Sequence, residues 1–267
     1  MPDRANVIYV YDGSFEGLLC CVFECFEKRE TPAAILTEYD RNPTLFPEKY
    51  IETDAEKYTR VKKGIITRVS MEAYELIENV YFSCHPEKEL LVCDFARLGI
   101  ANGKKITSCW ANETVNQVLR ASKHLSGEAH QLLGFVRFSD YNGVLVSVIE
   151  PKNFVLPRLA SHFCERYANE AFMIYDKTHG SALIYRPGES RIIPVSDFEE
   201  PPADAEELHF RRMWKAFYDT IAIKERENPR CRMGHMQKRY WSRLTELQDT
   251  GYGLKEEDRL RLANTKF

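Results

Sequence analysis

The sequence predicts an α+β protein with a helical N-terminal half, a central antiparallel sheet with a packed helix, and a C-terminal helical pair. Three observations lead to this class. Helix-start signals recur through the first half, short apolar or alternating segments begin at Gly134, and Pro201-Pro202 separates these from a last amphipathic stretch. With 267 residues, 44% of them hydrophobic, the chain can bury a substantial core. We expect a single domain over residues 1–250, followed by a charged tail over 251–267.

The helical part is expected over residues 12–133, after a strand at 6–11. Ser14 is placed to cap a first helix that ends near Arg29, and a connection containing three prolines follows it. Further helices are predicted to begin at capping residues or first-turn prolines, namely near Asp54, Ser70, Pro86 and Asn112.

The sheet part is expected over residues 134–198. Asn142-Gly143 between two apolar segments predicts a hairpin. A helix over 157–169 and three short strands, AFMIYD, SALIYR and RIIPV, complete a sheet that we predict to be antiparallel with a helix on one face.

The C-terminal helices are expected over residues 204–250. Asp204 with Glu207 resembles a capping box for a helix that ends near Glu227, where Asn228-Pro229 breaks it. A second helix is predicted over 236–247 with Tyr240 facing inward.

Positive charge is concentrated near the C-terminus. Residues 208–243 hold ten Lys or Arg and three acids, a net +7, whereas the whole chain carries −3. This is typical of a site for phosphate or another polyanion, or of a solvated helix face, and both interpretations stay open. The candidate nucleic-acid-binding residues are Arg137, Arg166, Arg226, Arg230, Arg232, Lys238, Arg239 and Trp241, the last as a base-stacking ring.

Four acid or imidazole side chains at predicted helix and strand ends are candidates for general acid or base catalysis: Glu128, His130, His162 and Asp176. The alternative for Asp176 is turn capping, and for the histidines it is packing or surface exposure. Glu128 and His130 are two residues apart, so they point to different faces if both are helical.

No metal or cofactor site is predicted. Cys231 and His235 are four residues apart, but no Cys or His nearby supplies a third zinc ligand. Dinucleotide-binding, P-loop and nucleophile-elbow motifs do not occur. Eight cysteines without a C-x-x-C pair, no signal peptide and no membrane-span pattern favour a cytoplasmic protein that does not enter the membrane.

Several segments resemble those of a known family in their order and spacing: YDGSFEGLLCCVFECF, GEAHQLLGFVRF, SHFCERY followed by IYD, and RENPR followed by KRYWSRLTE. They resemble a bacterial DNA-metabolism or DNA-repair family that carries domain of unknown function 4130. The resemblance extends from Val7 to Glu246. It departs at HMQKRYW, where we expect a proline ahead of the basic-Tyr-Trp run, so the entry into the last helix stays open. The matching positions are Asp12, Gly13, Glu128, His130, Arg137, Phe138, His162, Phe163, Arg166, Asp176, Arg226, Asn228, Tyr240 and Trp241.

The resemblance implies a role in DNA repair beside a radical-SAM protein, because members are typically encoded next to one. The domain also occurs fused to uracil-DNA-glycosylase-like domains. No catalytic assignment follows from it. Three hypotheses are therefore carried forward: a DNA-binding accessory protein, a hydrolytic enzyme on DNA such as a base-excising glycosylase, and a protein-interaction adaptor without DNA affinity.

Overall fold

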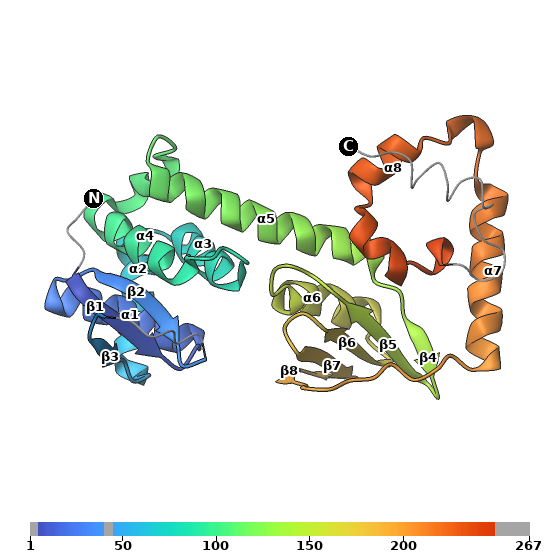
Figure 1. Ribbon diagram of the computed structural model, residues 1–267, viewed down its shortest axis with the longest axis horizontal. Helices are drawn as coiled ribbons and strands as arrows, with labels where there is room; N and C mark the ends of the chain where they lie inside the picture. The colour runs from blue at the N-terminus through green and yellow to red at the C-terminus, as the bar shows by residue number, and fades with distance from the viewer. Residues whose placement is uncertain (1–4, 40–44, 249–267) are drawn as a thin grey trace. The chain divides into compact units, whose positions relative to one another are not determined.

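The computed structural model describes residues 5–39 and 45–248 and has the predicted α+β class (Figure 1). The chain divides into two compact units, Met1–Gly127 and Glu128–Phe267, which we call unit 1 and unit 2. Among the described residues, no helix combines the length and the apolar character needed to cross a membrane. The charged tail expected over 251–267 lies outside the described residues.

Unit 1 contains a three-stranded parallel sheet of which only one strand was predicted. Its strands are β1 (Ala5–Tyr11), β2 (Pro32–Thr37) and β3 (Glu48–Tyr50), in the order β2-β1-β3. The stretch interpreted as a proline-bearing connection therefore supplies both edge strands. Pro32 begins an edge strand, and the Pro47 carbonyl accepts a hydrogen bond from the Ile8 backbone at 3.0 Å, so neither proline interrupts the pairing.

The helices that begin in unit 1 start near the predicted positions, and three of them have the predicted capping side chain. They are α1 (Phe15–Lys28), α2 (Ala55–Arg68), α3 (Met71–Phe82), α4 (Lys88–Asn102) and α5 (Glu113–Phe135), with a 3-10 turn η1 (Gly103–Ser108) before α5. The side chains of Ser14, Asp54 and Ser70 each accept a backbone N–H in the first turn. Cys20, Cys21 and Cys25 are buried in the core that α1 shares with β1, as small apolar residues would be.

Unit 2 contains a five-stranded sheet in sequence order: β4 (Ser139–Tyr141), β5 (Val144–Ile149), β6 (Ala171–Asp176), β7 (Ser181–Arg186) and β8 (Glu189–Pro194). The prediction of a wholly antiparallel sheet was wrong, because β5 and β6 pair in parallel. The helix between them, α6 (Leu156–Arg166), makes the crossover that a parallel pair requires and packs on β7 and β8. The predicted hairpin turn is present, with Asn142 and Gly143 at φ 55° and 83°.

The C-terminal part differs from the predicted helical pair. After α7 (Ala205–Ile221) and a 3-10 turn η2 (Lys224–Arg226), Asn228 caps a short helix α8 (Pro229–His235). The helix predicted over 236–247 is instead two 3-10 turns, η3 (Lys238–Arg243) and η4 (Thr245–Leu247). Tyr240 is nevertheless buried, as its place in the apolar stripe predicted.

Candidate functional site

The carboxylate of Glu128 is the centre of a buried hydrogen-bond network in unit 2. It accepts from the backbone N–H groups of Lys152 at 2.9 Å and Asn153 at 2.8 Å, in the loop after β5. From η3 it accepts the Tyr240 hydroxyl at 2.9 Å and Nη2 of Arg239 at 2.6 Å. The side-chain amide of Asn153 is a fifth donor. Glu128 is 3% exposed, so these donors surround it and leave little access for a reacting water.

The network holds Glu128 ionised. Burial on its own would raise the pKa of the carboxyl, but the hydrogen bonds from the backbone of Lys152 and Asn153 and from the Asn153 and Tyr240 side chains together outweigh it, and the pKa lies below its usual range. Burial and the adjacent Glu128 charge raise the pKa of Tyr240. The proton they share therefore resides on the tyrosine at neutral pH, and Glu128 acts as an anionic anchor between α5, the β5 loop and η3.

Asp176 forms a carboxylate–imidazole pair with His179 at the end of β6. Its Oδ2 lies 2.6 Å from Nδ1 of His179, and its Oδ1 accepts the backbone N–H groups of Thr178 at 3.0 Å and His179 at 3.2 Å. Asp176 is fully buried, whereas the His179 side chain is 29% exposed. The Asp176 contact fixes the imidazole orientation, and among the described residues Nε2 has no hydrogen-bond partner. This pair is the arrangement in unit 2 best suited to exchange a proton with a ligand.

The pair lies at the carboxyl ends of two parallel strands, where loops most often carry ligand-binding groups. Ile149 ends β5 opposite Asp176, and its carbonyl accepts the Lys177 N–H at 3.0 Å. The ring of Phe154 meets the His179 ring edge-on at 5.4 Å. The Glu128 carboxylate, from α5, binds the loop after β5, and Asp176 ends β6, so both carboxylates lie at this one strand edge.

Arg137 is engaged by a second buried acid, Glu246. Its Nη2 and Nε lie 2.7 Å and 3.2 Å from the two carboxylate oxygens, and the indole N–H of Trp214 donates to the same carboxylate at 3.1 Å. Burial would raise the pKa of Glu246, but the hydrogen bonds from Arg137, from its own backbone N–H and from Trp214, with the Arg137 charge, together outweigh burial and lower the pKa. The Arg137 charge is therefore neutralised where η4, α7 and the end of α5 meet.

An open groove of about 850 Å³ lies within unit 2 along α7. Its lining includes Phe138 and Leu145 from the sheet part and Phe210, Trp214 and Phe217 from α7. These three α7 rings are 51%, 42% and 53% exposed, so the apolar stripe of this helix lines a groove and is not closed into a core. Large rings held half-exposed on one helix face are typical of a surface that binds a partner.

Arg166 also lines this groove. Its guanidinium lies 5.8 Å from the Tyr167 ring centroid. Ion pairs hold the other two groove arginines, Arg137 to Glu246 and Arg211 to Glu207. Arg166 has no ion pair with a described residue, which leaves it able to meet an anion.

The segment from η2 to the first residue of η3 carries the remaining candidate cations. Arg226, Arg230 and Lys238 are exposed and Arg232 is half-buried. None of these four forms an ion pair with any residue that the structure describes. Arg239, in contrast, is paired with Glu128 and stacked on Tyr240 at 4.6 Å. The basic segment thus contains both neutralised and unpaired cations.

The other predicted site residues lie apart from these groups. His130 is exposed on α5, and His162 is half-buried with its ring edge-on to Phe163 at 5.1 Å. Trp241 is half-buried and its indole N–H donates to the Met236 carbonyl at 2.9 Å. The predicted catalytic residues therefore do not form one cluster: Glu128 and Asp176 share a strand edge, and the two histidines do not join them.

Two residues that the sequence reasoning missed are His179 and Glu246. The D-x-x-H spacing of Asp176 and His179 at the end of a predicted strand was the available signal for the first. Glu246 follows the buried stripe position Leu244 and is itself 3% exposed, but no sequence pattern identifies its partner Arg137. Among the residues described, no three His, Cys, Asp or Glu side chains are grouped so as to hold a metal ion.

Comparison with known protein families shows a match over more than half of the chain. A family described as a domain of unknown function, DUF4130, matches residues 86–246, which is 161 of the 267 residues and includes most of unit 2. The N-terminal motif beginning YDGSFEG lies outside the matched range. No curated protein and no solved structure matches the chain.

Proposed function

The chain belongs to the DUF4130 family, whose description assigns no activity, and we propose from the chemistry of unit 2 that the protein binds nucleic acid in DNA repair or processing. The observation that carries the proposal is the group of cations around α8. Arg226, Arg230, Arg232 and Lys238 have no acidic partner among the described residues, so their charge is available to phosphates.

The α7 groove favours single-stranded over duplex nucleic acid. Binding of a single strand combines cations that follow the backbone with aromatic rings on which bases stack. Phe210, Trp214 and Phe217 offer half-exposed rings, and Arg166 adds an unpaired cation to the same groove. In a duplex the bases are already stacked on one another, so these rings would add little to the affinity for duplex DNA.

The test is a salt titration of binding to labelled single-stranded and duplex DNA, followed by fluorescence anisotropy. The variant replaces Arg226, Arg230 and Lys238 with Gln. Its matched control replaces three exposed lysines of unit 1, Lys104, Lys105 and Lys123, with Gln, so that both proteins carry −6 in place of −3. We expect the first triple variant to flatten the single-strand salt slope by about 2, since each phosphate contact contributes about 0.7. Equal effects of both triples, or no binding of wild type at low salt, would contradict the proposal.

The stacking step has its own test. Phe217→Ala is expected to weaken single-strand binding by about 1–3 kcal/mol and to leave duplex binding unchanged. Met71→Ala, at a similarly exposed position of unit 1, serves as the control. If Phe217→Ala weakens both forms of DNA equally, the α7 face does not stack bases. If neither the wild type nor the variant binds either form of DNA, the exposed α7 face fits a protein partner better. The protein would then be an interaction adaptor.

The radical-SAM partner is proposed on the family resemblance alone. Co-expression with a radical-SAM protein of the kind encoded beside family members, followed by size-exclusion chromatography with and without DNA, tests it. Co-elution that requires DNA would indicate assembly on the substrate. Separate elution under both conditions would remove the partner from the proposal.

A hydrolytic function on DNA is the second candidate, and the Asp176–His179 pair favours it. An imidazole oriented by a buried carboxylate, with no hydrogen-bond partner for its Nε2 among the described residues, can take a proton from an attacking water. His179→Gln should then abolish base release from damaged single-stranded oligonucleotides, whereas His130→Gln, on the exposed face of α5, should not. If activity survives in His179→Gln, the Asp176–His179 pair has a structural role only, which is to stabilise the turn after β6.

A further inference from the structure

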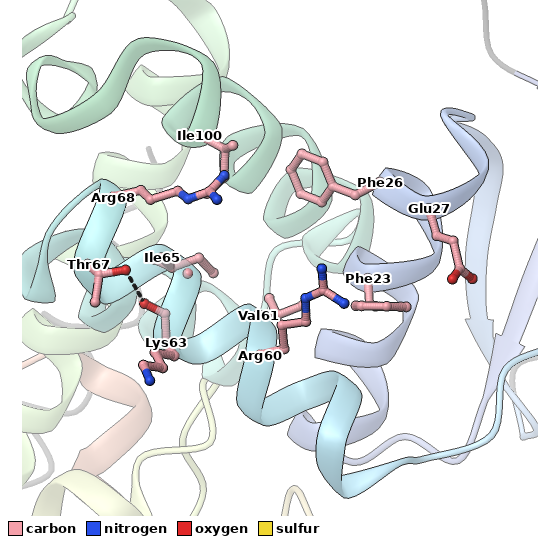
Figure 2. A pocket seen from close by; sticks show the side chains of 11 residues that line it. Phe23, Phe26, Glu27, Arg60, Val61, Lys63, Ile65, Thr67, Arg68 and Ile100 are labelled. Atoms are coloured by element: carbon pink, nitrogen blue, oxygen red, sulfur yellow. Dashed lines mark hydrogen bonds between the residues drawn. The ribbon is translucent and has the colours of Figure 1, made fainter.

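A pocket in unit 1 combines apolar walls with unpaired arginines. It has a volume of about 500 Å³, within the range of small-molecule sites. Figure 2 shows its lining from three helices: Phe23, Phe26 and Glu27 from α1, a long face of α2, and Ile100 from α4. All of these belong to unit 1, whereas the residues on which the proposed function rests belong to unit 2.

Helical spacing places the α2 residues on one face. Val61 and Ile65, one turn apart and both buried, form the floor. Gly64 lies between them, and a Cβ built there would meet nothing within 4 Å. The missing side chain of Gly64 therefore contributes to the open space, at the expense of helix propensity in the middle of α2.

Two arginines extend into the same space. In Figure 2 the Arg60 guanidinium lies beside Phe23 of α1 and the Arg68 guanidinium lies beside Ile100 of α4, whereas the Lys63 side chain points away from both. Both arginines are exposed, and neither forms an ion pair with a described residue. Glu27, the acid in the lining, lies 3.8 Å from Lys28. The pocket is therefore net positive and matches an anion.

The aromatic walls define the rest of the ligand. Phe26 is 40% exposed, and the Arg60 guanidinium lies 5.6 Å from the Phe23 ring centroid. A flat ring can pack against Phe26 over the apolar floor while a guanidinium binds phosphate oxygens in its two-pronged geometry. A single anion such as inorganic phosphate would leave the apolar floor uncovered.

We propose that this pocket binds a free nucleoside monophosphate, with the base over Phe26, Val61 and Ile65 and the phosphate between Arg60 and Arg68. The proposal does not depend on nucleic-acid binding by unit 2. A strand in the pocket would need a continuous path for its backbone, whereas this pocket has the volume of a small-molecule site.

Isothermal titration calorimetry of the full chain with AMP, adenosine and inorganic phosphate tests the ligand class. We expect AMP to bind about tenfold or more tightly than either fragment, because only AMP uses both the rings and the arginines. Equal affinity for AMP and adenosine, or no AMP binding at millimolar concentration, would overturn the proposal. An oligonucleotide that binds the pocket more tightly than AMP would also overturn it, since the ligand would then be a strand.

Variants locate the site. Gly64→Met should fill the pocket and abolish AMP binding, whereas Gly127→Met, at an exposed α5 glycine with equally open space, should leave it unchanged. Arg60→Gln with Arg68→Gln should reduce AMP affinity to that of adenosine. Thermal unfolding of each variant confirms that it is folded. AMP binding retained in folded Gly64→Met protein would place the site elsewhere.

Discussion

Replacing Glu128 with Gln should destabilise unit 2 more than any surface charge change. The carboxylate accepts from Lys152, Asn153, Arg239 and Tyr240, and a Gln amide would turn its own NH2 toward some of these donors. Arg239 would then lose its carboxylate while its side chain stays only 27% exposed. The loss in the free energy of unfolding combines the loss of an ion pair with the penalty for buried donors left without an acceptor.

Removing one member of a buried ion pair costs about 3–5 kcal/mol, and the partial exposure of Arg239 places the expected loss at about 3 kcal/mol. With a urea dependence of about 2 kcal/mol per molar for a unit of this size, the midpoint should fall by roughly 1.5 M. Tryptophan fluorescence in a Trp110→Phe background measures it, because the two remaining tryptophans, Trp214 and Trp241, both lie in unit 2. Glu189→Gln is the matched control, since Glu189 is likewise paired with arginine, here with Arg186 and Arg191, but on the surface.

The effect should depend on pH in a defined direction. The folded-state pKa of Glu128 is lowered below its unfolded value, so the stabilisation is fully present above about pH 5. It is lost as the pH falls through the folded pKa, because the native state must then take up a proton that the unfolded state already holds. The difference between wild type and Glu128→Gln should shrink over that acidic range. A urea midpoint for Glu128→Gln within error of that for Glu189→Gln, or a difference that grows toward acid, would refute the anchoring role.

Three smaller changes test the local structure. Asp54→Ala removes the acceptor of two backbone N–H groups at the start of α2 and should cost about 1 kcal/mol in urea unfolding of unit 1. Gly64→Ala should instead stabilise unit 1 by about 0.5–1 kcal/mol, because the position is helical and a Cβ meets no neighbour; a loss of stability would show that the site is tighter than described. Gly143→Val should destabilise the β4–β5 hairpin by roughly 1–2 kcal/mol, seen as faster amide exchange there, because φ is 83°.

Local signals in the sequence were reliable where the physics is local. Ser14, Asp54 and Ser70 each accept a backbone N–H within three residues, so the start of each helix is encoded by its own neighbours. The Asn142-Gly143 turn is similar, since its positive φ values demand those two residue types. The helix predicted over 236–247 shows the limit of periodicity. Tyr240 and Leu244 are buried at the predicted spacing, yet the backbone forms 3-10 turns.

Pairing over long distances was not predictable from such signals. The burial of strand β2 does not alternate between two faces of different polarity, and α4 packs on the strand. The parallel register of β5 and β6 follows from α6 crossing between them, a choice that the strand sequences alone do not specify. The D-x-x-H spacing of Asp176 and His179 can be seen in the sequence. The burial and orientation of the pair, however, depend on the pairing of β5 with β6, which the sequence does not specify.

A count of basic residues in the sequence overestimates the number of cations that are available to bind an anion. Arg137 and Arg239 are separated by 109 and 111 residues from the acids that bind them, Glu246 and Glu128, and both acids are buried. Of the seven candidate cations, five therefore remain without an acidic partner among the described residues: Arg166, Arg226, Arg230, Arg232 and Lys238. At about 0.7 per phosphate contact, a single-strand salt slope near −3.5 is the largest magnitude that these five can give. A slope near −5, as all seven would produce, would mean that nucleic acid displaces a buried carboxylate, and unit 2 would then have to rearrange on binding.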